Sequence, residues 1–479
     1  MNISRQFTVT ILVTISITFC ACHSRTAQAR QDNAKPNIIF ILADDLGYGD
    51  VGVFGQQKIE TPNLDRMAAE GMRFTQFYAG TSVCAPSRSS FITGQHTGHT
   101  PIRGNREVEP EGQWPLRSEA VTIAEFLKQA GYVNGCFGKW GLGPVGSEGD
   151  PLKQGFDRFF GYNCQALAHD YFPDHLWDND KKITLNNSPA SQHIYSADLI
   201  QRQAMNFIKQ HANQPFFLFL SYTLPHAALQ LPNGDKRFEY YKKKFNEKPK
   251  TVPAQWNGKG YQPQAYPLAA YAAMVDRLDA YAGEVMQQLQ QLNIDKNTIV
   301  LFASDNGPHR EGGNDVAFFN SNAGFKGIKR DLYEGGIRTP LIARWPGKIQ
   351  ENTTSSYTGA FWDLFPTMAA VAGLKPPAYI DGISFLPTLL GKKAQQQHEY
   401  LYWEFHENGG RQAVRIGNWK GVRNNASVNP NSPVELYDLS SDSTEQHNVA
   451  SAHPDVVARI ADIMRTARTE EKDFPFWKK

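Results

Sequence analysis

Cysteine is scarce in this chain of 479 residues, which contains only five. Cys20 and Cys22 lie in the N-terminal segment, so the rest of the chain holds Cys84, Cys136 and Cys164. An odd number of cysteines in an exported protein predicts one thiol that is reactive or modified, and Cys84 is our candidate. Cys136 and Cys164 either form a disulfide or, because Cys136 lies in a predicted buried strand, stay free in the core.

The sequence also has no marked excess of either charge. It contains 49 Lys and Arg and 47 Asp and Glu, which gives a formal net charge of +2. This balance gives no indication of a nucleic-acid partner. Long apolar runs are absent beyond the N-terminal segment, so no later segment is predicted to cross a bilayer. The hydrophobic share of 41% and the charged share of 20% are typical of a globular protein.

Residues 1–29 have the features of an export signal. Arg5 precedes an apolar stretch at residues 8–19 that is too short to span a membrane comfortably. Ala27-Gln28-Ala29 fits an ordinary cleavage site, whereas the residues up to Cys22 resemble a bacterial lipobox with Cys22 as the lipidated residue. We favour lipid attachment. It predicts a periplasmic protein or an outer-membrane-anchored lipoprotein that meets a membrane only through the lipid.

The length exceeds the usual size of one core, which predicts two domains or one large domain with an appendage. Nearly continuous apolar runs at residues 36–43, 214–222 and 298–303 are typical of strands buried on both faces of a parallel sheet. Helical patterns, such as residues 194–211, alternate with these runs and indicate crossover units. We predict an α/β fold with a large mixed, mostly parallel sheet flanked by helices.

The composition changes late in the chain, where residues 391–398 read as a polar linker. Beyond it we expect a small antiparallel sheet with one helix. Its four strands and helix are predicted at residues 400–405, 411–416, 419–423, 434–439 and 455–468. The predicted organisation is a linker up to residue 35, a catalytic domain at 36–390 and a C-terminal subdomain at 391–479.

Two of the apolar runs end in acidic residues. Asp44 and Asp45 follow the first run, and Asp305 and Asn306 follow the last. One such pair alone is more simply a solvated turn or a helix cap. Ligands of open α/β sheets gather at the carboxyl ends of strands, and an all-oxygen set suits Ca²⁺ or Mg²⁺ rather than zinc. The two pairs together predict a site for one hard cation.

The run Cys84-Ala85-Pro86-Ser87-Arg88 places a small nucleophile four residues before a fixed positive charge. Pro86 is expected to hold Ala85 extended, and Ser87 is expected to cap a helix over residues 89–93. This geometry would place Cys84 at a helix N-terminus, where anions and ionised nucleophiles are stabilised. The alternative is a structural cysteine buried before a helix.

Followed by Thr93-Gly94, this run resembles the signature of type I, formylglycine-dependent sulfatases of the alkaline-phosphatase-like superfamily. The resemblance covers nearly everything from residue 36 to 474 and is nearest to bacterial arylsulfatases and N-acetylgalactosamine sulfatases. It implies that a formylglycine-generating maturation enzyme converts Cys84 to formylglycine, whose hydrate is the nucleophile. It also implies one bound ion, Ca²⁺ in preference to Mg²⁺. The implied ligands are Asp44, Asp45, Asp305, Asn306 and the modified side chain of Cys84.

The resemblance assigns roles to four further residues. Arg88, Lys139 and Lys329 correspond to residues that neutralise the sulfate oxygens. His226 corresponds to the histidine that protonates the departing alcohol, and the ordinary histidine pKa of about 6.5 suits that task near neutrality.

One position departs from the family pattern. The stretch Gly138-Lys139-Trp140-Gly141 resembles a family motif in which a histidine stands in place of Gly141 and helps the hydrate to lose a proton. His169 and His309 are the candidates to replace it. Because His309 lies three residues beyond Asn306, we predict that His309→Ala slows turnover more than His169→Ala, which mainly raises KM.

The segment 159–177 mixes aromatic residues with two histidines. Similar segments occur in sulfatases acting on galactose-type sugars, so the resemblance makes His169 a candidate substrate contact, with His309 and His406 as further candidates. A packed loop and an ordinary sheet edge are the alternatives for His169 and His406. The expected function is hydrolysis of sulfate monoesters on carbohydrate of the galactose or N-acetylgalactosamine type.

Two other functions remain as alternatives. A phosphatase or phosphodiesterase of the same superfamily would need additional Asp and His zinc ligands, and none is apparent near Cys84 in the sequence. A non-catalytic sugar-binding relative is favoured by Gly141, but the retained Cys84, Lys139 and Lys329 count against it.

Overall fold

The computed structural model describes residues 35–477, except for 110, 189–190, 254–255 and 257–259. The predicted export signal at residues 1–29 and the lipid site at Cys22 lie outside the described residues. Within the described part of the chain, none of the helices combines the length and the apolar character that crossing a bilayer requires.

A ten-stranded mixed sheet forms the centre of the molecule, in the order β13-β2-β12-β11-β1-β10-β6-β7-β8-β9. The five strands from β11 to β7 run parallel, and antiparallel strands join on both sides. The strands are β1 Asn37–Ala43, β2 Met72–Phe74, β6 Val133–Lys139, β7 Arg158–Tyr162, β8 His175–Asp178, β9 Lys181–Thr184, β10 Phe216–Ser221, β11 Thr298–Ser304, β12 Leu341–Arg344 and β13 Thr353–Ser355. The prediction of a mostly parallel sheet is confirmed.

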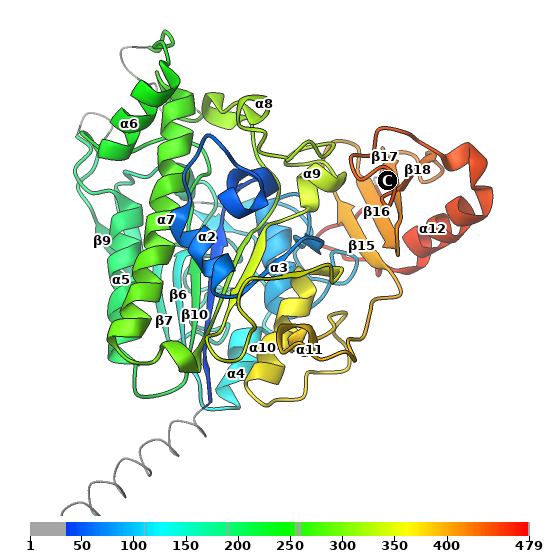
Figure 1. The fold of residues 1–479 in the computed structure, drawn as a ribbon, viewed down its shortest axis with the longest axis horizontal. Helices are drawn as coiled ribbons and strands as arrows, with labels where there is room; N and C mark the ends of the chain where they lie inside the picture. The colour runs from blue at the N-terminus through cyan, green and yellow to red at the C-terminus, as the bar shows by residue number, and fades with distance from the viewer. Residues whose placement is uncertain (1–34, 110, 189–190, 254–255, 257–259, 478–479) are drawn as a thin grey trace, which may run out of the picture.

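The central strands are buried on both faces because helices cover each side (Figure 1). Successive residues of β1 alternate between two cores: Ile39 and Ile41 pack into one, Ile38 and Phe40 into the other. Residues of α2 Pro62–Ala69, α5 Ser196–Gln210 and α7 Pro267–Gln291 line the first core. Residues of α3 Cys84–Thr93, α4 Ile123–Lys128 and α10 Leu364–Val371 line the second. Helix α6 Lys236–Phe245 packs on α7.

A second, four-stranded antiparallel sheet lies to one side of the large sheet, in orange and red in Figure 1. It consists of β15 Leu401–Phe405, β16 Arg411–Ile416, β17 Trp419–Asn424 and β18 Val434–Asp438, and α12 Pro454–Thr466 packs on it. Trp403 of β15 packs on Tyr78 and Trp362, which joins the two units. This is the small sheet with one helix that the sequence predicts, and the domain boundary near residue 391 stays a prediction.

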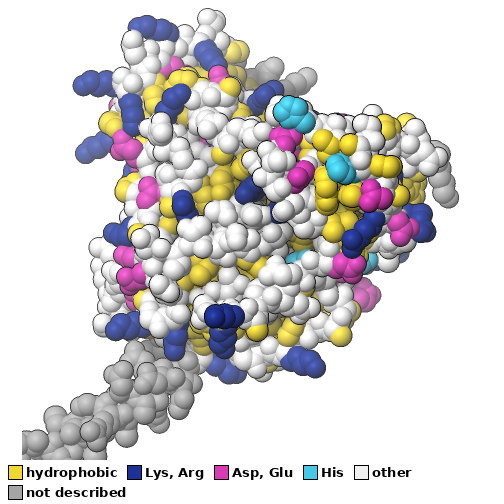
Figure 2. Space-filling view, turned by 45° about the vertical axis from the view of Figure 1, so that its right-hand side comes forward, with side chains coloured by type: hydrophobic (Ala, Val, Ile, Leu, Met, Phe, Trp, Pro, Cys, Tyr) yellow, Lys and Arg dark blue, Asp and Glu magenta, His cyan; other side chains and the backbone are white. Residues whose placement is uncertain are grey.

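The remaining short elements join these layers. They are β3 Phe77–Tyr78, β4 Glu107–Val108, β5 Gly112–Gln113, β14 Gly359–Ala360, α8 Val316–Phe319, α9 Glu334–Ile337 and α11 Leu386–Leu389. On the face shown in Figure 2, basic and acidic side chains are interspersed, in keeping with the balanced composition.

The start of α3 differs from the sequence prediction. The helix begins at Cys84 rather than near residue 89, and Ala85 is helical rather than extended. The first helical residues have no intrahelical acceptor for their N–H groups, so Pro86 in the first turn costs no hydrogen bond. Ser87 does not cap the helix; its hydroxyl accepts a hydrogen bond from the Gly80 N–H. The prediction that Cys84 lies at a helix N-terminus is nevertheless correct.

Candidate active site

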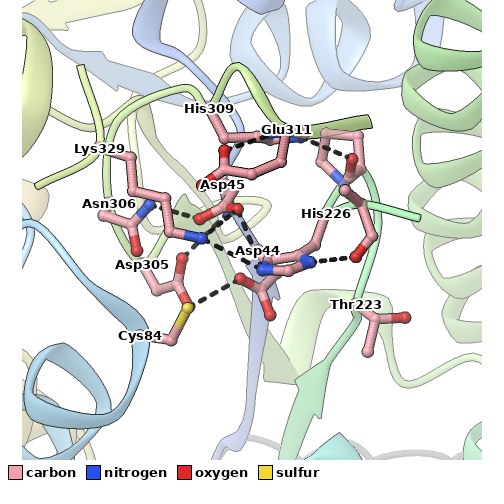
Figure 3. A network of polar contacts seen from close by, with 12 residues as sticks. Asp44, Asp45, Cys84, Thr223, His226, Asp305, Asn306, His309, Glu311 and Lys329 are labelled. Carbon is pink, nitrogen blue, oxygen red and sulfur yellow. Dashed lines mark hydrogen bonds and ion pairs between the residues drawn. The ribbon is translucent and has the colours of Figure 1, made fainter. Parts of the chain in front are cut away.

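The carboxyl ends of four parallel strands and the N-terminus of α3 meet at one buried site (Figure 3). Asp44 and Asp45 follow β1, and Asp305 and Asn306 follow β11, its neighbour in the sheet. The other predicted catalytic residues reach the same place: Lys139 ends β6, His226 follows β10, and Lys329 comes from the loop before α9. All of them are buried.

Cys84 faces the acidic end of this site. Its thiol donates a hydrogen bond to Oδ1 of Asp44 at 3.2 Å. Burial raises the pKa of the Cys84 thiol well above its ordinary value, and the charges of Asp305 and Asp44 raise it further. The side chain is therefore held as a neutral thiol. It projects from the first residue of α3, where the helix dipole favours negative charge.

Three cations surround the carboxylates. Arg88 donates to Oδ2 of Asp305 at 2.8 Å and lies 3.3 Å from Oδ2 of Asp44. Lys139 donates to the same Asp44 oxygen at 2.6 Å. Burial alone would raise the pKa of Asp44, but Lys139, His226 and Arg88 outweigh it and hold that pKa well below its ordinary range. Asp44 is therefore an ionised carboxylate.

On the other side of the site, Lys329 donates to Oδ2 of Asp45 at 2.7 Å. Asp45 has a left-handed backbone (φ 64°), a conformation that costs free energy in residues other than glycine and that clusters at functional sites. Its Oδ1 accepts a hydrogen bond from Nδ2 of Asn306 at 2.7 Å.

The donor atoms fit a hard cation. The Oδ1 atom of Asn306 is buried without a hydrogen-bond partner among the described residues, as a metal ligand would be before the ion is added. Burial and the charge of Asp44 raise the pKa of Asp305 to about 7. One compact group of possible ligands consists of Asp44, Asp45, Cys84 and His226.

That group contains His226 instead of Asp305, and the hydrogen bonds favour the oxygen set. Nδ1 of His226 donates to the carbonyl of Ala227, which leaves Nε2 as the lone-pair nitrogen. This Nε2 accepts a hydrogen bond from Lys329 at 3.1 Å, so it is already engaged. Burial and then the charge of Lys329 lower the pKa of His226 well below its ordinary value, so the ring is neutral. To donate a proton, His226 must therefore first take one up at Nε2.

His169 folds back over His226, although the sequence contained no sign of this contact. The two rings stack with centroids 4.7 Å apart and an interplanar angle of 2°. Burial, followed by the charges of Lys139 and Lys329, lowers the pKa of His169 to about 3. His309 lies on the other side, with its centroid 5.8 Å from that of His226.

Both ring nitrogens of His309 face oxygen atoms, and only Nε2 makes a hydrogen bond with a described residue. Nε2 lies 3.2 Å from the carbonyl oxygen of Pro225, and Nδ1 lies 3.3 Å from the carboxylate of Glu311 (Figure 3). The position of His309 shortly after β11 and Asn306 therefore no longer favours it over His169. Either residue could replace the histidine that the family has in place of Gly141.

We expect His169→Ala to lower kcat by about tenfold and His309→Ala to lower it less, which reverses the order predicted from the sequence. The reason is that His169 covers one face of the His226 ring, whereas His309 is tied to Pro225 and Glu311. The measurement is kcat and KM for both variants, with melting temperatures as a control for folding. A larger loss of kcat in His309→Ala would restore the original ranking.

His406 lies in a different network. Its Nε2 is 2.8 Å from Oε1 of Glu404, and its ring packs on Phe476. Glu404 also binds Arg103 at 3.3 Å and Arg468 at 2.9 Å. No contact between His406 and the residues around Cys84 occurs in the described part of the chain, so its role at the substrate rim stays a prediction.

Tyr261 is a residue of the site that the sequence analysis missed. It comes from the stretch between α6 and α7, and its half-buried ring lies 5.2 Å from the His169 centroid and 5.9 Å from that of His226. Burial raises its pKa to about 12. No motif surrounds Tyr261 in the sequence, so only the tertiary structure places it at the mouth of the site.

The structure also decides whether Cys136 and Cys164, which lie outside the site, form a disulfide. Cys136 and Cys164 are both buried and free, so the alternative of a disulfide between them is excluded. Cys84 is also free, which leaves it as a single buried thiol at a helix N-terminus.

The fold and this site define a hydrolase of the alkaline-phosphatase-like class. The family model Sulfatase matches residues 36–374, and the model N-sulphoglucosamine sulphohydrolase, C-terminal, matches residues 325–470. The chain belongs to the sulfatase family, and it is a sulfuric ester hydrolase.

Curated relatives agree with this assignment. The chain is 35% identical over 416 residues to N-acetylgalactosamine-6-sulfatase of Mus musculus, which covers 80% of this chain and 71% of the relative. It is 32% identical to arylsulfatase A of Homo sapiens, covering 89% and 87%. It is 30% identical to N-acetylgalactosamine-6-O-sulfatase of Bacteroides thetaiotaomicron, covering 92% and 94%.

Solved structures show the same fold. The structure of Ps i-CgsB in complex with k-i-k-neocarrahexaose superposes with a TM-score of 0.74 at 28% identity, over 90% of this chain and 92% of that chain. Phosphonate monoester hydrolase of Agrobacterium radiobacter superposes with a TM-score of 0.64 at 19% identity, over 93% of this chain and 100% of that chain. The second likeness shows that the fold extends beyond sulfatases.

Proposed function

We propose that this chain is an exported sulfatase that removes sulfate from carbohydrate of the galactose or N-acetylgalactosamine type, with a formylglycine made from Cys84. The observation that carries the proposal is the position of Cys84, the first residue of α3, 3.2 Å from Asp44 and facing a buried group of carboxylates and cations. The N-acetylgalactosamine-6-sulfatase relatives support the substrate class. A maturation enzyme that generates formylglycine is the implied partner.

The buried cations supply the charge that a sulfate ester needs. Arg88, Lys139 and Lys329 are fixed by Asp305, Asp44 and Asp45, so their positions are set before substrate binds. Preorganised cations in a site that excludes water stabilise the charge that develops on the sulfate oxygens during transfer.

Asp44, Asp45, Asp305 and Asn306 would hold Ca²⁺, with Mg²⁺ as the second choice. When bound, the ion acts as a Lewis acid that lowers the charge of the sulfate oxygens and of the modified side chain. The unpartnered Oδ1 of Asn306 and the ionised Asp44 support this assignment.

His226 would protonate the oxygen of the leaving alcohol as the sulfur–oxygen bond breaks. Because Nδ1 donates to the carbonyl of Ala227, Nε2 is the nitrogen that would carry this proton, and the ring returns to its neutral form once the proton has been transferred. The hydrate supplies two hydroxyls: one loses its proton and bonds to sulfur as the alcohol leaves, and the other gives its proton to a base or to water, so that its oxygen forms the aldehyde while the carbon–oxygen bond to sulfate breaks.

The sugar would lie where His226 faces outward. Tyr261 and His169 flank that position, and an aromatic ring beside a bound sugar contributes apolar contact area. Export and lipid attachment at Cys22 complete the proposal; fractionation of wild type against Cys22→Ser tests the lipid.

The test is sulfate release from a panel of sulfated mono- and disaccharides, run beside the matching phosphate esters and a phosphonate ester. The protein is produced together with a formylglycine-generating enzyme. We expect sulfate release from a galactose- or N-acetylgalactosamine-type sugar at a kcat/KM at least about 10²-fold above that for any phosphorus ester. A preference for phosphate or phosphonate would identify the rival hydrolase, and binding of sulfated sugar without release would identify a non-catalytic relative.

A further inference from the structure

Backbone hydrogen bonds continue past the last paired residues of β6 and β7. They extend the pairing of these two strands at the carboxyl end of the sheet, where the active site lies. Lys139 and Tyr162 are the last paired residues of these parallel strands. The backbone then continues the pairing, with Trp140 N–H donating to Tyr162 and Gly141 N–H donating to Asn163 at 3.3 Å. The loop that starts at Asn163 therefore leaves the sheet directly beside Lys139.

In space, this loop reaches from the end of β6 near Lys139 to His226. At its far end, His169 stacks on His226, and its carbonyl accepts a hydrogen bond from the N–H of Ala228 at 3.0 Å. Gln165 lies near the start of the loop. In chain order it lies between Lys139, the proposed sulfate-binding lysine, and His226, the proposed leaving-group histidine. The loop is thus tied to the active site at both ends.

Gln165 is 5% exposed, and its Nε2 is buried without a hydrogen-bond partner. Within the described residues no hydrogen bond uses either polar atom of this side chain. A buried amide without a partner is costly, and few persist in folded proteins. Those that do generally pair with water, an ion or a ligand.

The amide of Gln165 fills space that a side chain at position 141 would need. A Cβ added to Gly141 would lie 2.7 Å from Nε2 and 3.4 Å from Cδ of Gln165, which is closer than van der Waals contact permits for Nε2. Gly141 also has φ +73°, a left-handed conformation that favours glycine. Glycine at 141 and glutamine at 165 therefore form a matched pair two residues beyond Lys139.

We propose that Gln165 is a substrate-binding residue whose Nε2 donates a hydrogen bond to an oxygen of the bound sulfate group, and that Gly141 leaves the room this amide requires. The inference rests on the proposed function for the identity of the ligand. An amide adds a donor beside Gly141, two residues beyond Lys139, without adding charge, and it does not titrate. Its contribution to sulfate binding is therefore the same across the working pH range.

The test compares one substitution at two buried glutamines. Gln165→Met keeps the length of the side chain and removes its donor. Gln56→Met is the matched control, because Gln56 is also buried but its amide donates to the carbonyls of Gly49 and Phe319 and accepts from two backbone N–H groups. Each matured variant is examined for KM, kcat, competitive inhibition by inorganic sulfate, and melting temperature with and without sulfate.

We expect Gln165→Met to raise KM and the inhibition constant of sulfate about tenfold or more, as loss of a hydrogen bond to an anion does. Its melting temperature without sulfate should equal or exceed that of wild type, since an unpaired buried amide has been replaced by an apolar group. Gln56→Met should show the reverse, a lower melting temperature with an unchanged KM. Gly141→Ala should weaken sulfate binding in wild type but have no further effect in Gln165→Met.

An unchanged sulfate inhibition constant in Gln165→Met would overturn the inference, as would a fall in melting temperature as large as that of Gln56→Met. Sulfate-dependent stabilisation is measured without turnover. If wild type binds sulfate through Gln165 but releases none from any ester, the proposed function fails and the contact stands. If wild type is an active sulfatase and Gln165→Met binds sulfate normally, the contact fails alone.

Discussion

Cys84→Ser is expected to abolish sustained turnover and to leave one sulfate covalently attached to each chain. The serine hydroxyl would occupy the position of the thiol, at the start of α3 and beside Asp44, so attack on sulfur stays possible. A serine sulfate ester has no second hydroxyl on the same carbon, and therefore it cannot reform an aldehyde and expel sulfate. The steady-state kcat should fall by at least about 10³-fold, a typical loss when a covalent nucleophile is disabled.

The measurement is the intact mass of Cys84→Ser before and after incubation with substrate, together with its steady-state rate. Cys136→Ser is the matched control, because Cys136 is an equally buried free cysteine within β6. It should retain turnover per folded molecule and acquire no mass. Wild-type turnover in Cys84→Ser would remove the need for a modified cysteine.

Chelation is expected to abolish turnover, and added Ca²⁺ is expected to restore it. Four oxygen-bearing side chains converge in a buried site, where burial and the charge of Asp44 raise the pKa of Asp305 to about 7. Removing the ion should therefore also lower the melting temperature, because an ion that binds only the folded chain stabilises it. Asp305→Asn should lower kcat/KM by about 10²-fold or more and weaken the response to Ca²⁺.

Asp363→Asn provides the control for that substitution. Asp363 is as fully buried as Asp305, and it accepts hydrogen bonds from Tyr357, Ala360 and Ile383 rather than from residues of the proposed metal site. It should lower stability without changing the Ca²⁺ dependence of the rate. Stoichiometric zinc in the purified enzyme, with a rate indifferent to Ca²⁺, would contradict the assignment.

The sequence was sufficient to predict the end of the sheet at which the acidic residues gather. The apolar runs that become β1 and β11 are buried on both faces and pair in parallel, with Ala43 opposite Ser304. Residues that follow aligned parallel strands must lie together, so Asp44 and Asp305 converge for a reason visible in the pattern. Lys139 and His226 follow from the same rule.

The substrate side could not be predicted, because it depends on loops that fold back by tertiary contacts. His169 reaches His226 through a loop held by the N–H of Ala228, and Tyr261 arrives from the irregular stretch between α6 and α7. Neither contact leaves a periodic pattern or a spacing rule in the sequence. Gln165 was also missed, since only the structure shows that its amide lies unpaired against Gly141.

The start of α3 shows a local rule that tertiary structure overrides. The residue before a proline usually avoids the helical region, which led to an extended Ala85 as the expectation. In the fold, Ala85 is helical, its N–H donates to Asn105 at 3.2 Å, and the hydroxyl of Ser87 binds Gly80. These contacts from neighbouring segments fix the helix from Cys84 onward.

The most direct test of the central claim is the mass of the peptide that contains position 84, measured on the same matured preparation whose rate of sulfate release is determined. The account predicts an aldehyde or its hydrate in place of the thiol, in a fraction of chains that rises in proportion to the rate across preparations made with and without a formylglycine-generating enzyme. A fully active preparation in which residue 84 is an unmodified cysteine would contradict it.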